Sequence, residues 1–186
     1  PAWDFRVPGV TSVSADLHKF GYSPKGASVL LHRGRDRQRT QFFATTGWPG
    51  YPVVNPTILG SKSAGPLAAA WAITQHLGVD GFTELAGACM RATSAVRAAI
   101  DGIEGLRVVG EPVGPLLAVA ADAEVAPEQQ IDPHHWADAV RAHGFALQLQ
   151  PALAQTGGDA MPPTTHLTIP AVTERVLPEL LAALAA

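Results

Sequence analysis

Residues 12–28 read SVSADLHKFGYSPKGAS, and the fold prediction starts from this stretch. A short β-prone run over residues 11–15 leads into polar chain with Gly and Pro, and a second apolar run covers residues 28–31. Two strands joined by a sharp loop commonly hold reactive side chains rigidly at a sheet edge. The loop carries Lys19 and Lys25 beside His18 and Asp16. A nucleophilic lysine must lose its proton near neutral pH, which partial burial and a neighbouring cation both favour, so we expect the loop to supply both.

An isolated His-Lys pair is more often part of a solvated hairpin loop, since exposed lysines are the rule. The whole stretch, however, closely resembles the lysine segment of sphingosine-1-phosphate lyases and their bacterial relatives, in the fold type I group of pyridoxal-phosphate-dependent decarboxylases. Residues 4–10, DFRVPGV, lead into it as in that family. Residues 55–65, NPTILGSKSAG, followed by Ala70-Trp71-Ala72, resemble the family's Ser-Pro-Thr-x-x-Gly-Ser-Arg-x-Gly-Gly and Trp-Ala. The motifs extend from residue 4 to about residue 82, and beyond it only the layout is similar.

The resemblance implies a role for each loop residue. Lys19 corresponds to the lysine that binds the cofactor covalently, and His18 to a residue that contacts the cofactor phosphate. Lys25 corresponds to a second family lysine near the substrate that is implicated in proton transfer. Asp16 is too close to Lys19 to be the acid that pairs with the cofactor's ring nitrogen, and we expect it near the phosphate.

A second loop is implied to lie near the active site at a subunit interface. Gly60 and Ser61 match it, which makes a homodimer the expected assembly. The sequence departs from the family at Phe20 (usually Tyr), Lys62 (Arg) and Ala64 (Gly). A lysine cannot make the forked contact of an arginine with phosphate or carboxylate. Lys62 therefore bears on substrate identity more than on the cofactor.

By the same resemblance the fold class is α/β: the C-terminal part of a fold type I large domain, then a small α+β domain. We expect residues 1–80 to be the cofactor-domain part, 81–105 a connecting helix and 106–186 the small domain. The chain opens in the middle of the family pattern, so we expect the phosphate cup and the ring-nitrogen acid to lie upstream. Apolar surface left uncovered by that portion should favour self-association or association with another chain. Because the cup and the acid are expected upstream, this chain alone should bind the cofactor poorly or not at all.

Composition sets broad limits on function. The 186 residues are 47% hydrophobic and 16% charged with a net charge of −3, so no global charge favours nucleic acid or an acidic membrane. A lone cysteine, Cys89, fits a reducing compartment and sits in an apolar helical pattern typical of a core position. Neither a secretory signal nor an apolar run of membrane-spanning length is present, which makes the cytoplasm the expected location.

The remaining chain is assigned from periodicity. We expect a solvated turn at 33–39, a strand at 41–45, an irregular segment at 47–65, and helices over 66–77 and 81–103 separated at Gly78. A β-α-β-like alternation should follow, with strands at 106–109, 116–120, 145–149 and 166–169. Asp132 should cap a helix over 133–143, and a last helix should cover 173–184. This order suggests an antiparallel sheet in the small domain.

Other chemistries find little support. The histidines at 134, 135 and 166 lack the spacing of a zinc site, so we expect no metal. The basic cluster at 33–39 lacks the interleaved aromatics of an RNA-binding arm. A serine nucleophile elbow and a Walker-type phosphate loop are also absent.

Three functions remain open. The first is a pyridoxal-phosphate lyase that cleaves a phosphorylated long-chain base to an aldehyde and phosphoethanolamine, as in sphingolipid metabolism. The second is a decarboxylase of the glutamate decarboxylase group. The third is a non-catalytic piece that acts only as a folded interaction module.

Overall fold

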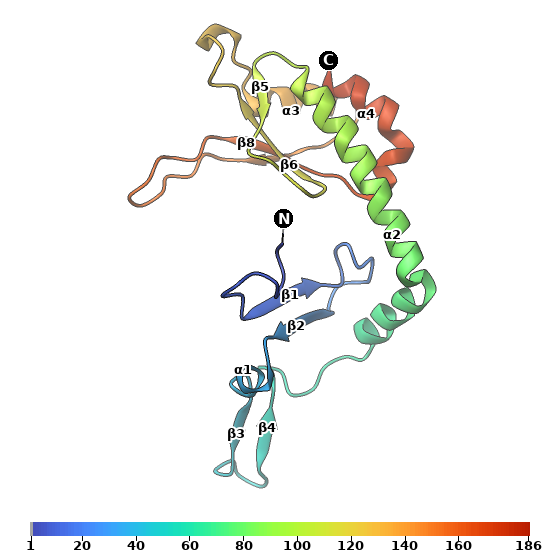
Figure 1. Ribbon diagram of the computed structural model, residues 1–186, viewed down its shortest axis with the longest axis vertical. Coiled ribbons are helices and arrows are strands. Elements are labelled where there is room, and N and C mark those ends of the chain that lie inside the picture. Colours follow the sequence, from blue (N-terminus) through green and yellow to red (C-terminus); the bar gives the residue numbers. More distant parts are fainter. Residues whose placement is uncertain (1) are drawn as a thin grey trace. The chain divides into compact units, whose positions relative to one another are not determined.

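The computed structural model describes residues 2–186, and its contacts divide the chain into two compact units, 1–82 and 83–186 (Figure 1). The expected division at residues 80 and 105 rests on the family layout and stays a prediction.

The first unit is built from two antiparallel hairpins. In the first, β1 (Ser12–Asp16) pairs with β2 (Ser28–His32), which confirms the two strands expected around the lysine loop. In the second, β3 (Phe43–Thr45) pairs with β4 (Val53–Asn55). The expectation of a wholly irregular segment over 47–65 is therefore wrong, because β4 gains its strand hydrogen bonds from β3.

Between the hairpins lies a short helix, α1 (Arg35–Arg39). We expected a solvated turn here. Asp36 in the first turn and Arg39 in the last suit the helix dipole, and the two side chains form an ion pair at 3.5 Å. No residue of α1 is buried, so the cluster is solvated, as expected, although it is helical.

Much of the first unit's apolar surface is exposed. In β2, the consecutive residues Val29, Leu30 and Leu31 are 39%, 50% and 51% exposed. Successive strand residues point to opposite faces, so both faces of this hairpin carry exposed apolar side chains. Parallel sheets covered on both faces have such continuous apolar strands. The β3–β4 hairpin and its flanks also expose large side chains, namely Phe43, Trp48, Tyr51, Val54, Ile58 and Leu59.

A long helical segment, α2 (Gly65–Asp101), follows and is interrupted at Gly78. Gly78 has φ 58° and ψ −170°, a backbone conformation that residues with a Cβ rarely adopt. The break confirms the two helices expected from periodicity. Cys89 is buried in the second of them, as its apolar surroundings indicated.

The second unit is an α+β domain whose four-stranded antiparallel sheet has the order β5-β6-β8-β7. Its strands are β5 (Leu106–Val108), β6 (Leu116–Ala121), β7 (Gln148–Gln150) and β8 (Thr164–Thr168). The antiparallel sheet was expected, but the β-α-β-like alternation is wrong, since β5 pairs directly with β6 and no helix separates them.

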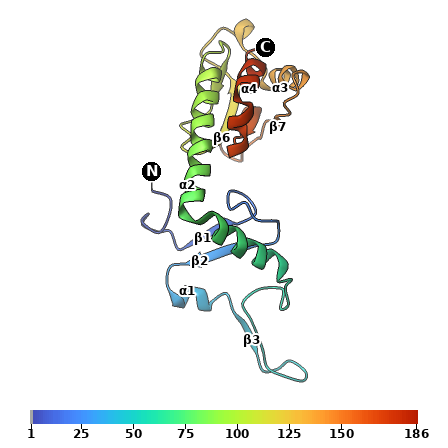
Figure 2. The ribbon, with the colours of Figure 1, turned by 90° about the vertical axis from the view of Figure 1, so that its right-hand side faces the viewer.

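Helices supply the other half of this unit's core. They are the second half of α2, α3 (Pro133–Ala142) and α4 (Leu177–Leu184), with short 3₁₀ turns at Pro127–Gln129 and Ala171–Val176. The second half of α2 and α4 run side by side in both views (Figures 1 and 2). Between helices and sheet lie the fully buried side chains of Val96, Ile100, Leu117, Val119, Val140 and Leu184. Trp136 Nε1–H also donates to the Leu184 carbonyl at 3.0 Å, which ties α3 to α4.

The predicted cap of α3 is present. Asp132 accepts hydrogen bonds from the backbone N–H groups of His134 at 2.7 Å and His135 at 3.2 Å. Its pKa is lowered, first by the His134 N–H bond and further by that of His135. Pro133 occupies the first turn, where no N–H is needed.

Replacing Asp132 by alanine should therefore lower the free energy of unfolding by about 1 kcal/mol at neutral pH. Because the folded-state pKa of Asp132 is lowered, the cap contributes fully above the unfolded aspartate pKa, about 3.9. It is lost as the pH falls through the folded value, so the two proteins should converge in acid. Urea titrations of both at pH 7 and below pH 3 measure this. Asp138→Ala, at an exposed position of the same helix, is the control, and an equal loss there would assign the effect to helix propensity.

Candidate functional site

The loop between β1 and β2 is held by its own backbone. Lys19 N–H donates to the Asp16 carbonyl at 3.1 Å, and Tyr22 N–H to the Lys19 carbonyl at 3.0 Å. Ser23 N–H then closes the loop on the Leu17 carbonyl at 3.0 Å. Tyr22 adopts φ 56°, a conformation uncommon for a bulky residue, within this series of turns. Lys19 is thus carried on a backbone fixed on both sides.

Lys19 and Asp16 are brought together by this turn. The Lys19 Nζ lies 2.7 Å from Asp16 Oδ2, and the Lys19 side chain is 66% exposed. The other oxygen, Asp16 Oδ1, accepts the Ser28 hydroxyl at 2.6 Å. The Lys19 ammonium, and then the Ser28 hydroxyl, lower the pKa of Asp16 to about 2. Partial burial and a neighbouring cation around the lysine stay a prediction; in this structure the group beside its ammonium is a carboxylate.

His18 is oriented by the opposite side of the loop. Its ring is half-buried, and Nδ1–H donates to the carbonyl of the buried Ala27 at 3.4 Å. This contact assigns the proton of the neutral ring to Nδ1. The imidazolium form can additionally donate from Nε2, which suits contact with an anion.

The second expected loop lies beside the first hairpin. Ser61 lines a hollow of about 550 Å³ together with Gly26, Ser28, Leu59, Lys62, Ser63 and Pro66. Gly60 is exposed next to it, and a Cβ on Gly60 would meet the Asn55 side chain at 3.1 Å. The fold thus brings the loop around Ser61 to Ser28 and Gly26 of the lysine loop. Lys25 is exposed and is not among the residues that line this hollow.

Ser28 is the residue that sequence reasoning missed. It is the cross-strand partner of Asp16 in the β1–β2 register, and this pairing brings its hydroxyl to the carboxylate. The signal was present in the sequence, because a serine opening the second strand of a hairpin faces the last residue of the first. To predict this contact from the sequence, the last residue of the first strand and the first residue of the second must both be known exactly.

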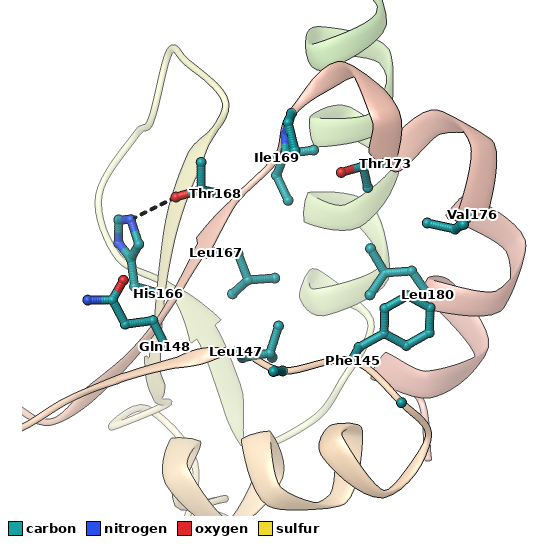
Figure 3. Close-up of a pocket in the computed structure, with 13 residues that line it drawn as sticks. Phe145, Leu147, Gln148, His166, Leu167, Thr168, Ile169, Thr173, Val176 and Leu180 are labelled. Carbon is teal, nitrogen blue, oxygen red and sulfur yellow. Dashed lines mark hydrogen bonds between the residues drawn. The ribbon is translucent and has the colours of Figure 1, made fainter. Parts of the chain in front are cut away.

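A second hollow, of about 410 Å³, lies in the second unit (Figure 3). Phe145, Leu147, Leu167 and Leu180 form apolar walls, and His166 stands at one edge, 3.4 Å from the Thr168 hydroxyl. Of its lining, His166 was considered from the sequence, as a metal ligand, and no binding role was predicted for this hollow. Across residues 2–186, no three side chains of His, Cys, Asp or Glu are grouped as metal ligands would be.

The lysine loop fits part of the cofactor that the resemblance implies. An exposed primary amine can bond to the aldehyde carbon of pyridoxal phosphate, and Lys19 presents one on a fixed backbone. His18 and the hydroxyl of Ser61 are groups of the kind that bind a phosphate. Asp16 already accepts donors from Lys19 and Ser28, one on each oxygen, and its expected place near the phosphate stays a prediction.

Comparison with known proteins supports the resemblance. The chain is 40% identical to sphingosine-1-phosphate lyase of Dictyostelium discoideum over 122 residues, or 66% of this chain and 23% of that protein. It is 41% identical to the rice enzyme of the same name over 123 residues, again 66% of this chain and 23% of the relative. The chain spans about a quarter of the length of these curated relatives. No family model matches the chain.

Solved structures identify the fold. The sphingosine-1-phosphate lyase of Burkholderia pseudomallei matches with a TM-score of 0.84 and 35% identity, over 99% of this chain and 38% of that one. A glutamate decarboxylase of Lactobacillus brevis (TM-score 0.75, 18% identity) covers 98% of this chain and 41% of that one, and shows the fold alone. The same holds for a cysteine desulfurase of Escherichia coli (0.63, 16%), with 94% of this chain and 45% of that one. These are fold type I enzymes, so the expected fold class is confirmed.

Proposed function

We propose that the complete protein is a pyridoxal-phosphate-dependent carbon–carbon lyase, because this chain is similar in sequence and in fold to part of the sphingosine-1-phosphate lyases. Its substrate is a phosphorylated long-chain base, which is cleaved to an aldehyde and phosphoethanolamine. The observation that carries the proposal is the exposed Lys19 amine on a hydrogen-bonded loop, within a sequence 40% identical to such a lyase.

In this proposal the residues of the chain have separate tasks. Bound pyridoxal phosphate acts as an electron sink for the carbanion left when a bond to the amine-bearing carbon breaks. Lys19 binds the cofactor's aldehyde carbon, and its amine can later hold or return a proton. His18 contacts the cofactor phosphate, and the hydrogen bond of its ring to the Ala27 carbonyl orients it. Asp16 lies beside Lys19, near the cofactor phosphate. Gly60 and Ser61 lie at the subunit interface and contribute to the active site of the second subunit.

Product analysis tests the reaction. The full-length protein, loaded with pyridoxal phosphate, should convert a phosphorylated sphingoid base to phosphoethanolamine and a long-chain aldehyde. A decarboxylase would instead release carbon dioxide from an amino acid such as glutamate. The 18% identity to glutamate decarboxylase supports the fold and not that reaction. If the loaded protein forms neither the lyase products nor carbon dioxide, the third function, a non-catalytic interaction module, is favoured.

Lys25 gives a prediction that separates substrate from cofactor. We expect Lys25→Ala to load with pyridoxal phosphate as the parent does, while turnover falls by about 10²–10⁴-fold, the usual contribution of a positioned proton-transfer group. Absorbance of the bound cofactor and product formation measure the two properties on the same sample. Arg35→Ala, which removes an exposed cation of α1 in the same unit, is the comparison. Equal loss of cofactor and turnover in Lys25→Ala would assign that lysine to cofactor binding.

We also propose a cytoplasmic homodimer with the active site at its interface. The exposed apolar side chains of the first unit support association, since large uncovered apolar patches favour it. Among the described residues, no helix combines the length and apolarity that crossing a membrane requires. Sedimentation velocity on the complete protein tests the assembly, and a monomer that turns over at full rate would contradict it.

A further inference from the structure

Asp16 makes two contacts that use its two oxygens separately. Oδ1 accepts the Ser28 hydroxyl across the strand pair at 2.6 Å, and Oδ2 meets the Lys19 ammonium at 2.7 Å. Asp16 and Ser28 are paired in the β1–β2 register, so the carboxylate is attached to a strand end and clamped from the neighbouring strand. Because the Ser28 hydroxyl holds Oδ1, the other oxygen, Oδ2, is presented to Lys19 in a fixed position.

Lys19 is joined to Asp16 twice. Its backbone N–H donates to the Asp16 carbonyl at 3.1 Å, and its ammonium folds back over the same turn to the Asp16 side chain. The amine therefore points at its own turn, although two-thirds of the side chain remains exposed to solvent. Exposure makes the lysine reachable, and the ion pair decides where its amine rests.

This resting position bears on the first chemical event required of Lys19. The nitrogen of the neutral amine bonds to the aldehyde carbon, the aldehyde oxygen leaves as water with both amine hydrogens, and a carbon–nitrogen double bond results. An ammonium must first release one proton to solvent and leave its hydrogen-bond acceptor. Leaving Asp16 Oδ2, which lies 2.7 Å from the ammonium, is an extra step that a lysine without such a partner does not make.

Resting on the proposed function, we infer that Asp16 is a positioning residue that latches the Lys19 ammonium in the cofactor-free chain and slows its capture of an aldehyde. Ser28 supports the latch by fixing the carboxylate. With a pKa of about 2, Asp16 is ionised throughout the neutral range in which capture takes place, so the latch is closed at physiological pH. An exposed ion pair has a modest effect, which sets the expected change at about two- to fivefold.

The test measures capture and not turnover. The purified chain is mixed with pyridoxal 5′-phosphate, samples are reduced with borohydride at intervals, and peptide mapping gives the rate of labelling at Lys19. Asp16→Asn should be labelled about two- to fivefold faster than the parent at pH 7.5, and Ser28→Ala should lie between them. Asp16→Glu, which keeps the carboxylate, should return the rate toward the parent value.

Two further comparisons isolate the latch from general charge effects. Removing an anion could also attract the phosphate, so unphosphorylated pyridoxal is used in parallel and the acceleration must persist. The ratio of variant to parent rates should fall toward one at about 1 M salt, where the Debye length is about 3 Å. Asp4→Asn is the matched control, because Asp4 is a carboxylate of similar exposure to Asp16 (32% against 34%) that pairs with Arg6 rather than with a lysine.

The outcomes distinguish the inference from the proposed function. Labelling of the parent at Lys19 with equal rates in Asp16→Asn and Ser28→Ala overturns the latch and leaves the function standing. Equal acceleration by Asp4→Asn, or acceleration with pyridoxal phosphate but not with pyridoxal, also overturns it. Failure of the parent to be labelled at Lys19, in the isolated chain and in the complete protein, contradicts the proposed function itself. Circular dichroism shows whether each variant is folded. If Asp16→Asn does not fold, the labelling rate of Ser28→Ala decides whether the latch exists.

Discussion

Replacing Lys19 by alanine is expected to abolish covalent capture of pyridoxal phosphate and to reduce turnover of the complete protein by at least about 10²–10⁴-fold. The variant lacks the amine that bonds to the aldehyde carbon, and His18 offers no equivalent group. Because Lys19 is exposed and its partner Asp16 lies in the same turn, the fold should tolerate the change. Borohydride reduction followed by peptide mapping, with product formation measured alongside, gives both effects.

The sequence offers a sharp control for this prediction. Its other lysines are Lys25 and Lys62, and the double variant Lys25→Arg with Lys62→Arg leaves Lys19 as the lysine that can be labelled. That double variant should retain capture. Label on Lys25 but not on Lys19 in the parent protein would move the covalent role to the other lysine of the loop.

Gly105→Ala should be the most destabilising single change in the second unit that removes no side-chain contact. Gly105 is buried between α2 and β5 with φ +92°, and a Cβ there would collide with the backbone carbonyl of Gln129 and lie 3.0 Å from the Ile131 side chain. Its own carbonyl accepts the N–H groups of Asp122 and Ile131, so the backbone cannot move away freely. The left-handed conformation and the collision together should lower the free energy of unfolding by about 2–5 kcal/mol.

Gly110→Ala separates the two causes. Gly110 also has positive φ, at +67°, but nothing lies within 4 Å of the position its Cβ would take. It should lose only the backbone part, about 1–2 kcal/mol. Urea unfolding of both variants measures the difference, and equal losses would show that the collision with Gln129 relaxes at no cost.

The sequence predicts elements that local chemistry determines. The strands around the lysine loop were predicted at 11–15 and 28–31 and lie at 12–16 and 28–32, because β-prone runs there are bounded by Gly and Pro. The break at Gly78 and the cap at Asp132 were predicted for the same reason: each depends on one residue and its near neighbours. Structure of this kind is encoded within a few positions.

Features that depend on distant partners were predicted less well. The three-residue β4 was missed because prolines flank it and its strand conformation depends on pairing with β3. The direct pairing of β5 with β6 was missed because strand order is a property of the whole sheet. At the site, the residue types were predicted, but the contact of Lys19 with Asp16 was not, since it depends on side-chain direction within a turn.

The pairing of β6 with β8 has a consequence for the chain as it leaves the ribosome. These strands are sheet neighbours, yet residues between Ala121 and Thr164 must be made before the pair can form. At about 5–20 residues per second, β6 waits roughly 2–9 s after its own synthesis with one edge unpaired. An unpaired strand edge can add a strand from another molecule. Nascent chains on a crowded polysome are therefore exposed to mispairing at β6 until Thr168 emerges, a hazard that the finished sheet no longer has.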